Sequence, residues 1–283
     1  MTNLVPYIPQ PKQLLLHQTT ALEIFYGGAA GGGKSHCLRY DAIELCYNVP
    51  GIFAALFRRT MPELEGNHIL QIRREIPPSM AIYHESRKRL EFANGSVLNF
   101  RHIEYEKDVM DFHGWELHWV GLDEASEFTP YQIDFVKSRI RLGGFAQKLE
   151  EMAKRNPKIA DYIPHLPRLV MTSNPGGPSH HYLKKNYIDP SPPMEIFDAH
   201  LANSEIRKGV ITRIFIPATM RDNKYLDENY DVQFAEMPEY KRRQYVDGDW
   251  DVVPGAFFDC WGPHNVIKPF VVLRPAIPFP VQN

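Results

Sequence analysis

The residues of this chain best suited to chemistry form one segment, Gly28-Ala29-Ala30-Gly31-Gly32-Gly33-Lys34-Ser35. Its glycines and alanines let the backbone curve closely and aim successive N–H groups at an anion. The segment has the spacing GxxxxGK[ST], in which the lysine reaches the β- and γ-phosphates of a nucleotide and the hydroxyl binds Mg²⁺. We therefore predict an ATP site in which Lys34 contacts phosphate and Ser35 binds Mg²⁺.

The flanks of this loop support the same interpretation. The apolar run Leu22–Tyr26 precedes it and predicts a buried strand, while His36–Tyr47 contains no Gly or Pro and predicts a helix. The N-terminus of that helix adds partial positive charge where the phosphates would lie. We expect residues 28–36, His36 included, to surround the nucleotide; a glycine-rich turn that binds nothing is the alternative.

A second apolar run, Leu117–Leu122, ends in the acids Asp123 and Glu124. Open α/β sheets bind ligands at the carboxyl ends of their strands, so both acids belong beside the loop. Adjacent residues of an extended chain point in opposite directions. We expect Asp123 to face Ser35 and Mg²⁺, and Glu124 to face the attacking water as general base. An ordinary strand end is the alternative.

A third run, Arg168–Thr172, continues into Ser173-Asn174-Pro175-Gly176-Gly177. It delivers polar groups to the same edge before a sharp turn. Asn174 or Thr172 is predicted to bond the γ-phosphate or the attacking water. An Asn-Pro turn without a ligand is the alternative.

The remaining elements define the fold class. Further strands are predicted at Gly51–Phe57 and Thr212–Ile216, and Asn94-Gly95 predicts a tight hairpin between Arg89–Phe92 and Ser96–Phe100. Strands that alternate with helical segments predict an α/β protein with a mostly parallel sheet flanked by helices. The segment Phe145–Pro167 reads as a peripheral insertion.

Composition narrows the class of protein. The 283 residues are 43% hydrophobic with a formal net charge of −2, which predicts a folded protein without a global basic signature. Cys37 and Cys46 fall in the predicted helix and read as small buried hydrophobes, and Cys260 adds no metal-ligand spacing. No signal peptide or membrane segment is recognised, so we expect a cytosolic protein.

The three elements, in this order, resemble the ATPase domain of the large terminase subunit of tailed bacteriophages. Further segments carry the same resemblance: Lys12-Gln13, Leu56-Phe57-Arg58-Arg59-Thr60, Phe92-Ala93-Asn94-Gly95-Ser96, Arg139-Ile140-Arg141, Arg221-Asp222-Asn223-Lys224-Tyr225-Leu226, Gly248-Asp249-Trp250 and Gly255-Ala256-Phe257-Phe258.

The resemblance implies a P-loop NTPase of the additional-strand, catalytic-glutamate type with a small lid subdomain. It divides the chain into an ATPase core at 1–222, a lid at 223–251 and a linker at 252–283 leading toward an absent nuclease domain, so nuclease activity is not expected. It also implies that Gln13 contacts adenine. The loop carries no arginine, which moves the search for an arginine finger to Arg58, Arg59, Arg139 and Arg141.

The implied function is ATP-driven translocation of double-stranded viral DNA into a procapsid, in the cytoplasm of the host cell. The implied partners are DNA, a portal protein, the small terminase subunit and further copies of the chain in a ring, with no membrane. Two alternatives remain open. One is a P-loop helicase or recombination ATPase, and the other is a nucleotide-gated assembly module without catalysis.

Overall fold

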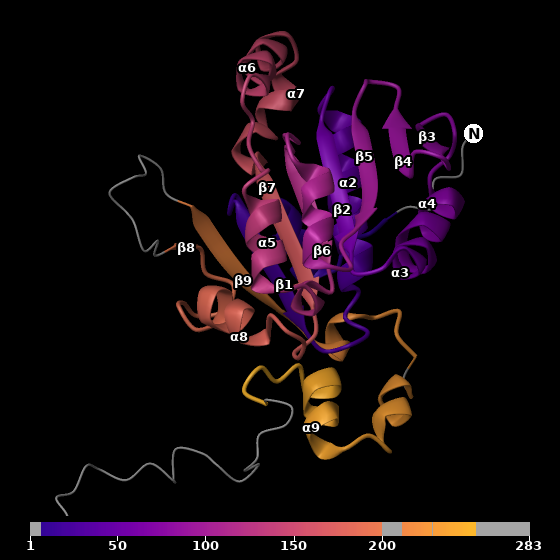
Figure 1. Cartoon of the computed structure of the whole chain (residues 1–283), viewed down its shortest axis with the longest axis vertical. Coiled ribbons are helices and arrows are strands. Elements are labelled where there is room, and N and C mark those ends of the chain that lie inside the picture. Colours follow the sequence, from indigo (N-terminus) through magenta and orange to yellow (C-terminus); the bar gives the residue numbers. More distant parts are fainter. Residues whose placement is uncertain (1–6, 200–210, 228, 253–283) are drawn as a thin grey trace, which may run out of the picture.

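A nine-stranded sheet forms the centre of the molecule, which we describe from a computed structural model covering residues 7–199, 211–227 and 229–252 (Figure 1). The strand order is β3-β4-β5-β2-β6-β7-β1-β9-β8. The six strands from β5 to β9 in this order pair in parallel, whereas β3, β4 and β8 join through antiparallel pairs. The strands are β1 (Glu23–Gly28), β2 (Phe53–Arg58), β3 (Ala81–His84), β4 (Arg89–Phe92), β5 (Val97–His102), β6 (Trp119–Asp123), β7 (Arg168–Ser173), β8 (Phe197–Asp198) and β9 (Thr212–Ala218).

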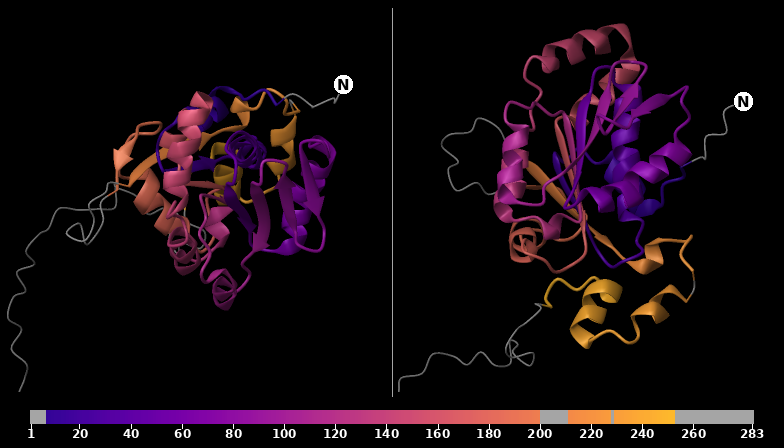
Figure 2. Two further views of the ribbon diagram at one scale, coloured as in Figure 1. Left: turned by 90° about the horizontal axis from the view of Figure 1, so that it is seen from above. Right: turned by 45° about the vertical axis from the view of Figure 1, so that its right-hand side comes forward.

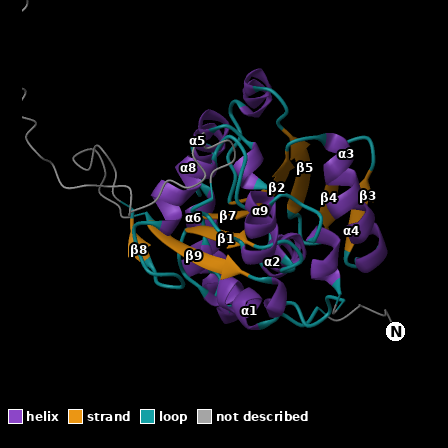
Figure 3. Cartoon of the chain, turned by 90° about the horizontal axis from the view of Figure 1, so that it is seen from below, coloured by secondary structure: helices purple, strands orange, loops and turns teal. Residues whose placement is uncertain are grey.

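Helices cover both faces of the sheet (Figure 2, right panel). The view from below shows α1 and α2 on one face and α5 and α8 on the other (Figure 3). The α-helices are α1 (Pro11–Gln18), α2 (Lys34–Asn48), α3 (Met61–Leu64), α4 (Leu70–Glu75), α5 (Pro130–Lys137), α6 (Phe145–Arg155), α7 (Pro157–Ala160), α8 (His180–Leu183) and α9 (Glu239–Arg242). No helix in the described ranges is long and apolar enough to cross a membrane.

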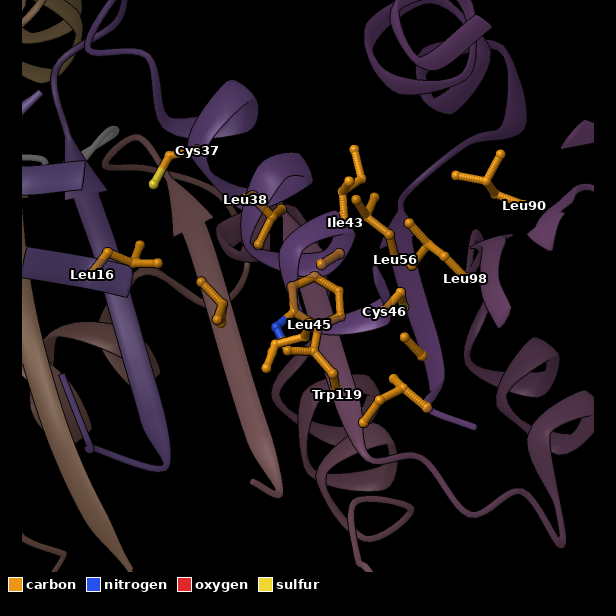
Figure 4. Packing of buried hydrophobic residues seen from close by; sticks show 14 of the residues in the cluster. Leu16, Cys37, Leu38, Ile43, Leu45, Cys46, Leu56, Leu90, Leu98 and Trp119 are labelled. Atoms are coloured by element: carbon orange, nitrogen blue, oxygen red, sulfur yellow. The ribbon is translucent and has the colours of Figure 1, made fainter. Parts of the chain in front are cut away.

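Alternation along the buried strands produces two apolar cores. Ile24 packs into the core beneath α2, while its neighbour Phe25 packs into the core beneath α5. Leu56 and Phe57 of β2 divide in the same way. Figure 4 shows the first core, in which Cys37 and Cys46 lie fully buried, as the sequence predicted. Strands buried on both faces explain why the sequence shows continuous apolar runs.

The predicted strands and the hairpin are confirmed, with ends that agree within two residues. The prediction that Phe145–Pro167 is a peripheral insertion is correct for its largely exposed outer side but wrong in placing the whole segment outside the core. Leu149 of α6 and Ile159 of α7 are buried in the first core, at the amino edge of the sheet. The charges of this segment occupy only the outer side of an amphipathic helix, which composition alone does not separate from an exposed insertion.

Short helical turns between Met220 and Asp247 lie below the carboxyl edge of the sheet (Figure 1). Seen from below, α9 projects over the carboxyl ends of the central strands (Figure 3). The segment contacts the glycine-rich loop, since an ideal Cβ on Gly248 would lie 2.5 Å from the Ala29 nitrogen. The predicted Gly255–Phe258 signature, Cys260 and most of the predicted linker lie outside the described residues.

Candidate functional site

The loop between β1 and α2 adopts a backbone that needs glycine at both ends. Gly28 has φ 143° and Gly33 has φ 73°, a region that L-residues with a Cβ rarely adopt. A Cβ would also lie 2.3 Å from the Ala218 carbonyl oxygen at Gly28, and 2.7 Å from Gln13 Nε2 at Gly33. Both glycines are therefore required by conformation, and Gly28 is also required by its close approach to the Ala218 backbone.

Side chains hold the carbonyl groups of this loop from outside. Asn223 Nδ2 donates to Gly31 O at 2.7 Å, Tyr26 Oη to Gly32 O at 3.2 Å, and Gln13 Nε2 to Gly33 O at 3.1 Å. In a trans peptide unit the N–H group points away from the C=O group. Holding three carbonyls outward therefore turns the next three N–H groups inward, which is the arrangement needed to bind phosphate oxygens.

Lys34 begins α2 and is almost fully buried. Its Nζ atom donates to Ala29 O at 2.5 Å and to Asn174 Oδ1 at 2.6 Å. Burial lowers the pKa of Lys34, while Glu124 and Asp123 oppose that change. The contact brings together two of the elements that the sequence singled out, the loop and the end of β7.

Asp123 ends β6 with both carboxylate oxygens fully engaged. Oδ1 accepts from Ser35 Oγ at 2.9 Å and from Thr172 Oγ1 at 2.6 Å. Oδ2 accepts from Arg58 Nε at 2.9 Å and from His68 Nε2 at 2.8 Å. Burial alone would raise the pKa of Asp123, but the hydrogen bonds from His68 and Thr172 and the charge of Arg58 hold it well below its usual range. Asp123 is therefore a carboxylate beside Ser35, as predicted.

Glu124 follows in the left-handed region, with φ 55° and ψ 51°. This conformation, rather than the alternation of an extended strand, separates its side chain from that of Asp123. It costs about 1–3 kcal/mol for a residue other than glycine, and such strain gathers at functional sites. Burial and the charge of Asp123 raise the pKa of Glu124 to about 7, against Lys34 and Arg58. A carboxyl group with this pKa is matched to proton transfer near neutral pH.

The structure places the four candidate arginines in two groups. Arg58 and Arg59 lie at the carboxyl edge: Arg58 is 3.7 Å from Glu124 Oε1, and Arg59 donates to Glu127 O at 2.7 Å. Arg139 and Arg141 flank a backbone bridge to Leu117, before β6 begins, and Arg141 pairs with Glu116. Arg139 and Arg141 therefore lie at the opposite edge of the sheet, away from this chain's own phosphate loop, which leaves Arg58 and Arg59 as the candidates near it.

Gln13 and His36 lie beside the loop. Gln13 is buried and accepts from the Gln10 backbone while it donates to Gly33 O, so in this structure it supports the loop. The His36 ring packs against Tyr7 and Tyr40, with centroids 5.2 and 4.9 Å away, and burial lowers its pKa.

A cavity of about 170 Å³ lies between Glu124 and the segment formed by α9 and the turn after it. Its lining includes Glu124, Asn174, Lys241 and Tyr245. The Ala30 N–H group donates to Tyr245 O at 2.7 Å, so this segment also contacts the loop backbone. Sequence reasoning missed Tyr245 because its contribution is a main-chain carbonyl, and missed His68 because nothing in its local sequence marks it.

The donor set suits Mg²⁺. Magnesium is commonly bound by one or two protein oxygens together with substrate phosphates, rather than by an all-protein cage. Ser35 and Asp123 supply such oxygens 2.9 Å apart, and no group of three or more ligating His, Cys, Asp or Glu side chains occurs among residues 7–199, 211–227 and 229–252.

The fold and the site together define a P-loop NTPase of the additional-strand class, because β7 lies between the loop-bearing β1 and the acid-bearing β6. A profile of the phage terminase large subunit family matches residues 20–247. The chain belongs to this family. A comparison with curated proteins finds no match. Membership of this family does not favour the two alternatives, a helicase or recombination ATPase and an assembly module without catalysis.

Solved structures show the same fold. The ADP complex of the large terminase from a thermophilic bacteriophage aligns with a TM-score of 0.61 at 15% identity, covering 86% of this chain and 54% of that chain. The ATPase domain of the Thermus phage P74-26 large terminase aligns with a TM-score of 0.52 at 16% identity, covering 86% and 94%. The chain thus spans about half the length of the first of these two proteins.

Proposed function

We propose that this chain hydrolyses ATP to drive the translocation of double-stranded viral DNA into a procapsid. The observation that carries the proposal is Glu124, which has a left-handed backbone and a carboxyl pKa raised to about 7 beside the phosphate loop of a terminase-family fold. The large terminase that gives the TM-score of 0.61 forms complexes with ADP and with ATP-gamma-S, which supports a nucleotide as the ligand.

Each element of the site has one task in this proposal. The inward N–H groups and Lys34 bind the phosphates, and Ser35 and Asp123 hold Mg²⁺, which would neutralise charge on the phosphate oxygens. Glu124 orients the attacking water and accepts its proton. Asn174 accepts a hydrogen bond from Lys34. Its task in this proposal is to respond to hydrolysis, because loss of the γ-phosphate changes the hydrogen-bond partners of the lysine. Arg58 is the candidate for stabilising charge that develops during transfer.

We further propose that residues 223–251 form a lid subdomain on an ATPase core of residues 1–222, followed by a linker at 252–283. Tyr245 and Asn223 support this division because both bond the loop backbone from the lid side. Gln13 is proposed to contact the adenine base, and His36 is proposed to contact the nucleotide beside the loop. DNA translocation further implies a ring of copies docked on a portal protein, recruitment of the small terminase subunit, and action in the host cell cytoplasm.

ATP turnover measured with and without linear double-stranded DNA tests the proposal. We expect Mg²⁺-dependent hydrolysis at a low basal rate that linear DNA increases. An arginine finger is worth about 10³–10⁵ in rate when it is in place, and an isolated chain lacks any finger that a neighbour supplies. Hydrolysis by the wild-type chain no faster than that of a Lys34→Ala control would contradict the proposed ATPase activity. Turnover that does not change when DNA is added would contradict the proposed role in DNA translocation.

A further inference from the structure

His68 lies next to the proposed metal site although it belongs to none of the three sequence elements. Its side chain is fully buried on the π-helical turn Glu65–Ile69, between α3 and α4. Nε2 lies 2.8 Å from Asp123 Oδ2. Nδ1 has no hydrogen-bond partner within the described part of the chain. Among those residues, the hydrogen bond to Asp123 is thus the one polar contact of the ring.

The direction of that bond follows from chemistry. An ionised carboxylate only accepts hydrogen bonds, so Nε2 must carry the hydrogen atom. Burial lowers the pKa of His68, although the hydrogen bond and charge of Asp123 oppose this change. With its hydrogen atom on Nε2, the buried ring is a donor of fixed direction toward Asp123.

The turn that carries His68 is tied to the helix that begins at the phosphate loop. Arg39 of α2 donates to Asn67 O at 3.1 Å and pairs with Glu75 of α4 at 3.3 Å. Both Arg39 and His68 are buried. Single π-turns interrupt regular hydrogen bonding and occur frequently at functional sites. The irregular turn therefore places the His68 imidazole against Asp123 Oδ2, and the contacts of Arg39 fix the position of this turn relative to α2.

The two donors on Asp123 Oδ2 differ in what else they contact. Arg58 Nη2 also lies 3.7 Å from Glu124 Oε1, so the guanidinium group can move toward Glu124 when that carboxyl group is ionised. His68 has no second acceptor anywhere in the ranges that the structure describes. If Arg58 turns toward a phosphate, as a finger must, His68 alone still holds Oδ2.

We propose that His68 is a positioning residue that keeps Asp123 Oδ1 directed at Ser35 and thereby sets the Mg²⁺ affinity of the nucleotide site. This inference rests on the proposed ATPase function. Residues that orient a metal ligand typically contribute about 10–100-fold to metal affinity. Without His68, Asp123 Oδ2 keeps one donor, Arg58, in place of two, so the rotation of the carboxylate is less constrained.

The test is the Mg²⁺ dependence of nucleotide binding, followed by the fluorescence of a labelled ADP, with Mn²⁺ binding by electron paramagnetic resonance as a second readout. His68→Leu removes the donor, and His68→Gln retains an N–H donor at a similar reach. His118→Leu is the matched control, because His118 is a buried histidine at the opposite edge that accepts one bond from the Phe53 N–H group.

We expect His68→Leu to raise the Mg²⁺ midpoint about tenfold or more, and His68→Gln to stay within about threefold of wild type. His118→Leu should lower thermal stability without moving the midpoint. An unchanged midpoint in His68→Leu, equal defects in the Leu and Gln variants, or an equal rise in His118→Leu would each overturn the proposal.

A measurement on the unaltered chain covers the case in which His68→Leu does not fold. Long-range proton–nitrogen correlation spectra should show a hydrogen atom on His68 Nε2, and a ring that carries its hydrogen atom on Nδ1 alone would overturn the proposal. The outcomes also separate the two hypotheses. A wild-type chain that does not turn over ATP contradicts the proposed function, whereas normal wild-type turnover with an unmoved Mg²⁺ midpoint contradicts only the role of His68.

Discussion

Lys34 Nζ lies 2.6 Å from Asn174 Oδ1, which joins the first turn of α2 to the end of β7. The lysine is buried and its second partner is the carbonyl oxygen of Ala29 in its own loop. A buried ammonium group is strongly stabilised by a charged partner, because burial removes its hydration. In the proposed function a bound phosphate supplies that charge, and the Lys34–Asn174 contact then connects the ligand to the strand that follows the acids in the sheet.

Lys34→Ala should abolish hydrolysis and weaken nucleotide binding, because the site loses the ammonium group that neutralises the β- and γ-phosphates. Steady-state turnover and binding of labelled ADP check both effects. Lys148→Ala is the control, since Lys148 lies on α6 at the opposite edge of the sheet. Turnover of Lys34→Ala within about threefold of wild type would remove the phosphate role of this lysine.

The two adjacent acids should respond differently to removal of their charge. Glu124→Gln is expected to bind ATP with Mg²⁺ yet lose about two to four orders of magnitude in turnover, the usual contribution of a general base. Asp123→Asn should instead raise the Mg²⁺ requirement, because its oxygen beside Ser35 loses its negative charge. Rapid-quench kinetics and Mg²⁺ titrations separate the effects. The assignment is wrong if both variants show the same pure binding defect.

The rate should depend on pH through Glu124. Its pKa is raised to about 7, so the group is protonated below that pH and cannot accept a proton from water. We therefore expect kcat/KM to rise as pH increases through about 7 and then level off. The profile of kcat/KM between about pH 5.5 and 9 measures this dependence. A flat profile over the acid half of that range would show that another group, or another step, limits the rate.

The sequence was sufficient to predict the elements whose signal is local. The loop has a fixed spacing from Gly28 to Ser35, the strands buried on both faces show continuous apolar runs, and Asn94-Gly95 marks its hairpin. The acids were predicted on the correct strand because strand ends meet at one edge of a parallel sheet.

Features that depend on pairing distant parts of the chain were not predictable. His68 reaches Asp123 across 55 positions, through an irregular turn that no sequence pattern marks. Arg139 was a candidate because the loop has no arginine and the segment Arg139-Ile140-Arg141 carries the family resemblance, yet its backbone pairs with Leu117 before β6 begins. The left-handed Glu124 arises where β6 gives way to a tight turn, and its side chain type alone does not reveal it.

The two groups of arginines lead to the last prediction. Arg58→Ala removes the cation shared by Asp123 and Glu124, so turnover should fall by at least about tenfold while nucleotide binding persists. If Arg58 is the arginine finger itself, the loss in turnover should reach about 10³–10⁵-fold. Arg139→Ala should leave the basal turnover of the isolated chain unchanged, because its residue lies at the opposite edge of the sheet. Turnover and labelled-ADP binding are compared at several protein concentrations. Normal hydrolysis by Arg58→Ala would remove the role of this residue. A loss in Arg139→Ala that grows with protein concentration would instead indicate an arginine that acts on a neighbouring copy of the chain.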